Sequence, residues 1–321
     1  LRDNTTGDGN TAVGYSALLK NTTADNNTAI GRVAMEENTT GTDNTAVGGN
    51  ALAVNTTGAS NVAIGKDALE ANTTADYNTA VGRSALGDNS TGASNTAVGY
   101  LALKSNTTAA DNTAVGRSAG QEITTGTYNT AVGSMALDAL TTASDNTAIG
   151  YGALTALISS SGNTAVGKNA AYNSGGNSNI AVGYDAMQAA TSVNKCTIVG
   201  YQAMYAHSGS GDEGNTMLGY RAGFSETTGW GNTFAGFEAA ANITTGSHNT
   251  FIGYQAGGSA TTGQFNTCLG RLAQPSSSTA SNECVLGDNN ISTLRCNTQT
   301  ISALSDRRDK TDIVDLPIGL D

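Results

Sequence analysis

The sequence contains little of what a globular domain is usually built from. Of its 321 residues, 13% are charged and 5% are aromatic, and there are two prolines, two histidines and four cysteines. Leucine, isoleucine, valine and phenylalanine together account for 53 residues, or about 17% of the chain. This share lies below the level at which a chain is suspected of disorder. Order must therefore come from how the residues are arranged along the chain.

The same shortages exclude several classes of function. With 15 basic residues and a net charge of −11, the chain lacks the basic surface that nucleic-acid binding requires. It has no run of eighteen apolar residues, so we expect no membrane insertion. Its histidines and cysteines do not have the spacing of a zinc site, and we expect neither metal nor cofactor. Cys196, Cys268, Cys284 and Cys296 are expected to be buried and free, an interchain disulfide being the alternative.

The chain does have a short tandem repeat. The motif Asn-Thr-Ala-Val/Ile-Gly recurs every 17 residues through ten copies, and the later intervals are 16 to 19 residues. Its glycines are Gly14, Gly31, Gly48, Gly65, Gly82, Gly99, Gly116, Gly133, Gly150, Gly167, Gly183, Gly200, Gly219, Gly236, Gly253, Gly270 and Gly287. Seventeen residues hold two short strands and two turns, but no helix. The repeat therefore predicts an all-β fold, a parallel β-solenoid of about seventeen coils over residues 1–287.

The alternation inside the motif predicts which side chains face the core. Threonine and valine alternate with alanine and glycine, as in a β-strand. We expect the valine face, with Val13, Val47 and Val98, to lie inside the coil, and the alanines, such as Ala97, to form an outer face of small residues. The core predicted in this way buries little apolar area. The sequence therefore predicts self-association through the alanine face, as a parallel three-chain rod.

Other repeated positions have more than one interpretation. The glycine is expected to meet a backbone requirement, either a positive φ or a close approach of the chain. The recurring Asn-Thr-Thr matches the N-glycosylation pattern, but its spacing favours an asparagine ladder between coils. The tyrosines that follow the glycine form either a sugar-binding stripe or, as we favour, a rim over the coil edge. The asparagines are Asn4, Asn21, Asn38, Asn55, Asn72, Asn89, Asn106 and Asn242, and the tyrosines are Tyr15, Tyr100, Tyr151, Tyr184, Tyr201, Tyr220 and Tyr254.

The repeat changes in its last third. At the alanine position, larger side chains appear, and we expect the axis of the assembly to widen or repack there. These residues are Ile198, Met217, Phe234, Phe251, Cys268 and Val285. The 19-residue interval before Gly219 contains an insertion at residues 208–212, which is interpreted as a looped-out bulge.

The repeat resembles the head repeats of trimeric autotransporter adhesins. The resemblance lies in Asn-Thr-Ala-Val-Gly and in the variant Asn-Val-Ala-Ile-Gly that ends at Gly65, and it covers nearly the whole of residues 4–287. Those heads form a left-handed parallel β-roll in a three-fold assembly. The resemblance therefore implies a homotrimer.

A second resemblance lies near the end of the sequence. Residues 301–313, Ile-Ser-Ala-Leu-Ser-Asp-Arg-Arg-Asp-Lys-Thr-Asp-Ile, resemble the opening of the endosialidase-type intramolecular chaperone of phage tail fibres and tailspikes. That module drives trimerisation and, in many members, cuts itself off before the serine of a Ser-Asp-x-x-x-Lys motif. The resemblance implies that residues 288–304 form a neck and that residues 305–321 begin the module.

The same resemblance implies one chemical step. Ser305 would be the nucleophile, Lys310 the base, and the bond between Leu304 and Ser305 the one that is cut, once per chain. A lysine acts as a base only when burial or nearby cations keep it neutral. The alternative interpretation is that Ser305 or Asp306 caps a short helix. We expect no other enzymatic activity.

Together these features predict a structural protein. The first hypothesis is the homotrimeric shaft of a phage tail fibre or tailspike, located on the virion. Its expected partners are copies of itself, other tail proteins and a host receptor, either a glycan or an outer-membrane component. The alternatives are a bacterial trimeric surface adhesin or extracellular filament protein with the same repeats, and the shaft of a polysaccharide-degrading tailspike.

Overall fold

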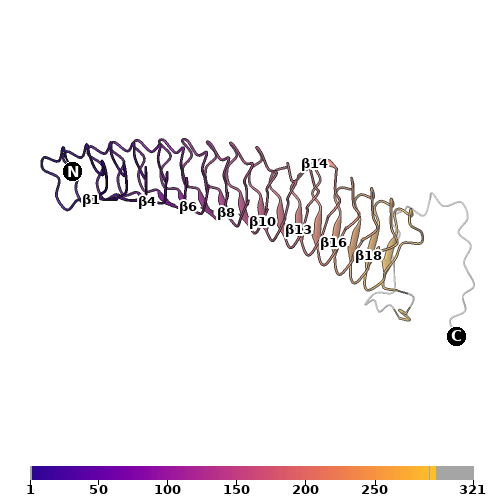
Figure 1. Cartoon of the computed structure of the whole chain (residues 1–321). Coiled ribbons are helices and arrows are strands. Elements are labelled where there is room, and N and C mark those ends of the chain that lie inside the picture. Colours follow the sequence, from indigo (N-terminus) through magenta and orange to yellow (C-terminus); the bar gives the residue numbers. More distant parts are fainter. Residues whose placement is uncertain (1, 289, 294–321) are drawn as a thin grey trace, which may run out of the picture. The chain divides into compact units, whose positions relative to one another are not determined.

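The chain winds into a stack of coils, which follow one another from the N-terminus towards β19 (Figure 1). The computed structural model describes residues 2–288 and 290–293, and these contain strands and turns but no α-helix. The chain divides into two compact units, Leu1–Asp288 and Asn289–Asp321. The first unit is a parallel β-solenoid, which confirms the predicted fold class.

Each coil contributes one three-residue strand to a single 17-stranded parallel sheet. Its strands are β1 (Thr11–Val13), β2 (Thr28–Ile30), β3 (Thr45–Val47), β4 (Val62–Ile64), β5 (Thr79–Val81), β6 (Thr96–Val98), β7 (Thr113–Val115), β8 (Thr130–Val132), β9 (Thr147–Ile149), β10 (Thr164–Val166), β11 (Ile180–Val182), β13 (Thr197–Val199), β15 (Thr216–Leu218), β16 (Thr233–Ala235), β17 (Thr250–Ile252), β18 (Thr267–Leu269) and β19 (Cys284–Leu286). Two further strands, β12 (Ser192–Asn194) and β14 (Ser210–Asp212), pair with each other in parallel. The insertion predicted as a bulge therefore supplies a strand.

Neighbouring coils pair without offset, so equivalent residues form straight rows along the stack. Between β5 and β6, for example, Ala80 lies opposite Ala97 and Val81 opposite Val98. The prediction of two strands per coil is wrong, because the Asn-Thr-Thr stretch forms a bend instead. Its backbone is nevertheless bonded from coil to coil, as where the Thr39 amide donates to the Thr56 carbonyl at 2.9 Å.

The strands turn their alanines inward, opposite to the predicted orientation. Ala97 is fully buried, whereas Val98 is 36% exposed and Val13 is 57% exposed. The interior is narrow, and the far side of the coil already fills it with a leucine such as Leu103 and with asparagine side chains. In these coils, the space left between the strand and the far side holds only the methyl group of an alanine. The larger apolar residue of each strand is therefore left on the outer surface.

The large residues of the later strands also lie inside their own coils, so the predicted widening of an assembly axis at Ile198 is wrong. Met217, Phe234 and Phe251 are fully buried. Space for them comes from the position six residues later, where a small residue replaces the usual leucine: Gly223 after Met217, Ala240 after Phe234 and Gly257 after Phe251. A Cβ on Gly257 would lie 2.1 Å from the Phe251 ring, and one on Gly223 would lie 2.3 Å from the Met217 sulfur. A larger residue on the strand is thus paired with a smaller one at the facing position, and the core stays filled.

Buried asparagines form two rows along the stack. In the Asn-Thr-Thr row, the Asn38 side-chain amide donates to Asn21 Oδ1 at 3.1 Å and to the Gly41 carbonyl at 2.9 Å. In the second row, which precedes each strand, Asn44 Oδ1 accepts the Asn61 backbone amide at 2.9 Å. The ladder interpretation is confirmed for the first row. Its members from Asn21 to Asn106 are fully buried, so a glycan cannot be attached to them in the folded chain.

The repeat glycines meet both expected backbone requirements. Gly48 has φ of +139°, and a Cβ built on it would lie 2.5 Å from the Gly65 carbonyl oxygen. Its amide donates to the Ile30 carbonyl at 2.8 Å. The glycine row therefore lets adjacent coils touch backbone to backbone at the corner after each strand.

Candidate self-association surface

The candidate functional surface is the outer face of the main sheet, defined here by the first and third residues of each strand. The first position is usually threonine and the third is usually valine or isoleucine, so β-branched side chains follow each other at the strand spacing over most of the sheet. Because 17 strands stack about 4.8 Å apart, the outer face is roughly 75–80 Å long. Its exposed apolar residues are Val13, Ile30, Ile64, Val98, Val115, Ile149, Ile180, Leu218, Ile252, Leu269 and Leu286.

This surface has the chemistry of an interface between proteins. Monomeric soluble proteins rarely expose long continuous apolar patches, and such patches mark sites of association. The strands supply no charged side chain to the outer face, since their first and third positions hold threonine, valine, isoleucine, leucine, alanine or cysteine. A second copy of the same flat face could therefore pack against it without burying an unpaired charge.

The tyrosine row lies next to the outer face, directly after the repeat glycine. From Tyr184 to Tyr254 its rings stack in parallel, with centroids 4.9–5.2 Å apart and with Phe237 between Tyr220 and Tyr254. Each inner ring uses both faces on its neighbours and leaves its edge to solvent. A sugar ring would need a free aromatic face. For the stacked rings from Tyr184 to Tyr254, this arrangement supports the rim interpretation over the sugar-binding one.

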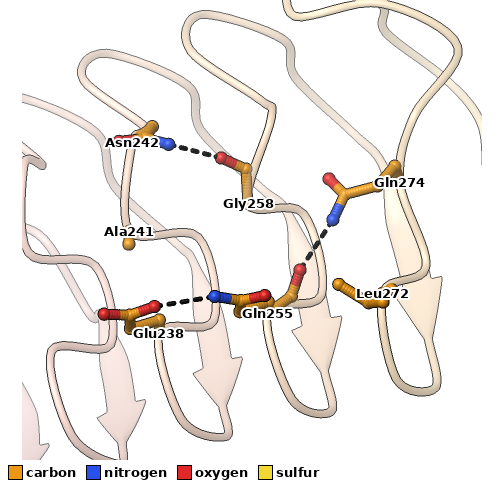
Figure 2. A pocket seen from close by; sticks show the side chains of 7 residues that line it. All are labelled: Glu238, Ala241, Asn242, Gln255, Gly258, Leu272 and Gln274. Carbon is orange, nitrogen blue, oxygen red and sulfur yellow. Dashed lines mark hydrogen bonds between the residues drawn. The ribbon is translucent and has the colours of Figure 1, made fainter.

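A shallow pocket lies in the later coils, but its polar groups bind one another (Figure 2). The Gln255 amide donates to Glu238 Oε2 at 2.8 Å, and the Gln274 amide donates to the Gln255 carbonyl at 2.7 Å. Asn242 donates likewise to the Gly258 carbonyl at 2.7 Å. Glu238 is the one carboxylate among the lining residues, whereas glycoside hydrolysis uses a pair. These bonds join successive coils, and the pocket offers no catalytic arrangement.

The structure locates the predicted repeat residues but leaves the predicted self-cleavage residues open. Ser305, Lys310 and Leu304 lie outside the described residues, as do the predicted neck from residue 294 onwards and Cys296. Cys196 and Cys268 are buried and free, as predicted, but Cys284 is free and exposed, so its predicted burial is wrong. Within residues 2–288 and 290–293, no group of three or more metal-binding side chains could hold an ion. The described part also has no helix long and apolar enough to cross a membrane.

Comparisons with known proteins do not identify a family for this solenoid. No protein-family model matches the chain, and no curated protein sequence matches it. What the structure defines is a class of architecture, a β-solenoid of tandem 17-residue repeats.

Proposed function

We propose that this chain is the shaft of a phage tail fibre or tailspike, built as a parallel homotrimer that supports attachment to the host surface. The observation that carries the proposal is the outer face, a long, uncharged row of β-branched residues on a rigid stack of coils. In the proposed trimer, the outer faces of three chains turn towards a common axis. This replaces the alanine face of the sequence prediction, because the alanines are buried within each chain.

The regular stack supports a structural role. Every coil is joined to the next by the sheet, and the earlier coils are also joined by two asparagine rows, so the solenoid can transmit force and hold a distance along its length. The number of chains and the phage origin rest on the two resemblances in the sequence. The host receptor, whether a glycan or an outer-membrane component, and the other tail proteins would be contacted by parts of the fibre that the shaft positions.

Two other functions share the same shaft. A bacterial trimeric surface adhesin or extracellular filament would use the same repeats on a cell. The shaft of a polysaccharide-degrading tailspike would carry its catalytic residues in another domain. The resemblance of residues 301–313 to the phage chaperone module favours the virion over both a cell surface and a free filament.

Antibodies raised against the solenoid separate these locations. Applied to phage particles and to intact bacteria from the same source, they are expected to label tail fibres in electron micrographs. Labelling of the bacterial surface with unlabelled particles would reject the phage proposal and support the adhesin. A depolymerase assay on the labelled particles then distinguishes a tailspike from a fibre that only attaches.

Self-cleavage before Ser305 is part of the proposal for a precursor that carries the whole chaperone module. The serine hydroxyl would attack the carbonyl of Leu304 while the assembled module holds Lys310 close enough to accept the proton. The C–N bond between Leu304 and Ser305 breaks, the serine nitrogen leaves as an amine, and water hydrolyses the resulting ester to free the Leu304 carboxylate. We predict that mass spectrometry of the purified precursor shows a product ending at Leu304, and that Ser305→Ala gives an uncut trimer. An uncut wild-type trimer, or cutting that persists in Ser305→Ala, would contradict this step.

A further inference from the structure

A buried group of ionisable side chains interrupts the regular interior at the 19-residue coil. His207 and Glu226 occupy successive steps of the row that holds Asn21 to Asn106 earlier in the chain, and both are fully buried. Glu213, at the end of the inserted segment, is 6% exposed and joins them. A polar, ionisable group thus stands where the neighbouring coils place Ala190 and Ile243.

The geometry places the imidazole between the two carboxyl groups. His207 Nδ1 is 3.7 Å from Glu226 Oε2, and His207 Nε2 is 3.9 Å from Glu213 Oε1. Both ring nitrogens and Glu226 Oε2 lack a hydrogen-bond partner, although they are buried. Only the other oxygen of Glu226 is satisfied, by the Asn232 amide at 2.7 Å. Three buried polar atoms without hydrogen-bond partners cost free energy of folding. A change of protonation that gives these atoms partners would therefore stabilise the site.

The backbone closes over the cluster, and no lysine or arginine among the described side chains forms an ion pair with it. A Cβ on Gly209 would lie 2.5 Å from His207 Nε2 and 2.9 Å from Glu213 Oε1, so the backbone closes directly over the group. The Cys196 thiol also faces the two carboxyl groups. Burial raises the pKa of Cys196 to about 12, so the thiol remains neutral. Among the side chains that the structure describes, the ionisable groups at the site are one imidazole, two carboxyl groups and a neutral thiol.

We propose that His207, Glu213 and Glu226 form a proton-dependent latch that fastens the inserted segment to the stack in acid and loosens it towards neutral pH. With both carboxyl groups ionised, the buried cluster carries a net negative charge even when the imidazole is protonated. Uptake of one further proton by a carboxyl group makes it neutral, and the imidazolium can then direct Nδ1–H at Glu226 and Nε2–H at Glu213. The latch therefore closes by gaining a proton.

The electrostatics give the direction of the effect. Burial raises the pKa of both Glu213 and Glu226, and the nearby imidazole lowers it by a smaller amount. A carboxyl group with a raised pKa binds its proton more tightly in the folded chain than in the unfolded one. Its contribution to stability is complete below the ordinary glutamate pKa and is lost as the pH rises through the folded value.

The latch lies where a local opening can be separated from the rest of the shaft. β14, formed by the insertion, pairs only with β12, whereas the main sheet continues past it from β13 to β15. Figure 1 places β14 on the side of the stack away from the main sheet. Loosening the latch would thus free this side of one coil and create a bending point, while the regular coils before and after it stay folded.

Hydrogen exchange of the full chain, followed by mass spectrometry, tests the latch. After correction for intrinsic exchange, the opening of peptides within residues 197–231 is expected to increase between pH 5.5 and 7.5, by up to about tenfold for each pH unit over which the folded chain binds one proton more than the open one. Peptides within residues 61–112 serve as the internal reference and should change little. Glu226→Gln, which keeps an acceptor for Asn232 but cannot ionise, is expected to abolish the difference, whereas Glu122→Gln on the surface should retain it.

Two outcomes would overturn the proposal. One is equal pH dependence in the 197–231 and 61–112 peptides of the wild type. The other is a pH-dependent opening that persists in Glu226→Gln. If Glu226→Gln loses protection along the whole shaft, Glu213→Gln is measured in its place and judged by the same two outcomes.

Discussion

Ala97→Asp is expected to open its coil and to lower the free energy of unfolding by at least about 3 kcal/mol, because it places an unpaired charge in the closed interior. Ala97 is fully buried and lies between Ala80 and Ala114 in adjacent coils. The far side of the coil offers only apolar and amide groups. Urea unfolding followed by circular dichroism measures the loss.

The matched control is the next residue of the same strand. Val98 is part of the outer face, so Val98→Asp leaves the coil interior unchanged and should alter the stability of a single chain by only about 0.5 kcal/mol. Its effect is expected on association instead. A greater loss of circular dichroism in Val98→Asp than in Ala97→Asp would show that the strand faces the opposite way.

Gly48→Ala is expected to destabilise the solenoid by about 2–3 kcal/mol, from a left-handed backbone that disfavours a side chain and from a clash with the next coil. The added Cβ would lie 2.5 Å from the Gly65 carbonyl oxygen, which belongs to backbone and cannot swing aside. The two coils would have to separate, and the bond from the Gly48 amide to the Ile30 carbonyl would be strained. Thermal unfolding is the measurement.

Gly49→Ala provides the control one residue away. A Cβ on Gly49 meets no atom within 4 Å, and its φ lies outside the left-handed region. Its melting temperature should therefore stay close to that of the wild type. Equal effects of the two substitutions would mean that the backbone contact between coils is not what requires glycine at the repeat position.

The period of the sequence was enough to predict the solenoid and its register. Because the glycine and the Asn-Thr-Ala-Val/Ile motif recur every 17 residues, equivalent residues had to stack, and the amide ladder of Asn21, Asn38 and their equivalents followed from that spacing. A positive φ was one of the two backbone requirements that the recurring glycine predicted. These features depend only on the fact that one coil is repeated above the next, and the 17-residue period of the sequence shows this directly.

The orientation of the strand could not be read in the same way. Alternation separates two faces but does not say which is buried, and the usual preference for burying the larger residue pointed to Val98 instead of Ala97. The answer depends on the width of the coil, which Leu103 and the asparagine rows on the other side already fill. A clue was present in Phe251, whose coil has Gly257 where a leucine is usual, since only facing positions in one interior need to exchange volume.

The His207 cluster was missed for a related reason. His207 and Glu226 are 19 residues apart, and Glu213 lies within the irregular interval, so no motif connects them. Counting seven residues from Gly200 and Gly219 would have placed the first two in the buried asparagine row. Glu213 joins them only because the insertion folds back over the coil, which depends on its local backbone.

The mass of the full chain in solution tests the central claim most directly. Sedimentation equilibrium at micromolar concentration is predicted to give three times the 32.2 kDa chain mass. Val98→Asp combined with Val115→Asp is predicted to shift the mass towards that of a single chain with its circular dichroism spectrum retained, since both residues lie on the outer face. A folded wild-type monomer, or a trimer unaffected by these substitutions, would contradict the account of a shaft assembled through its outer face.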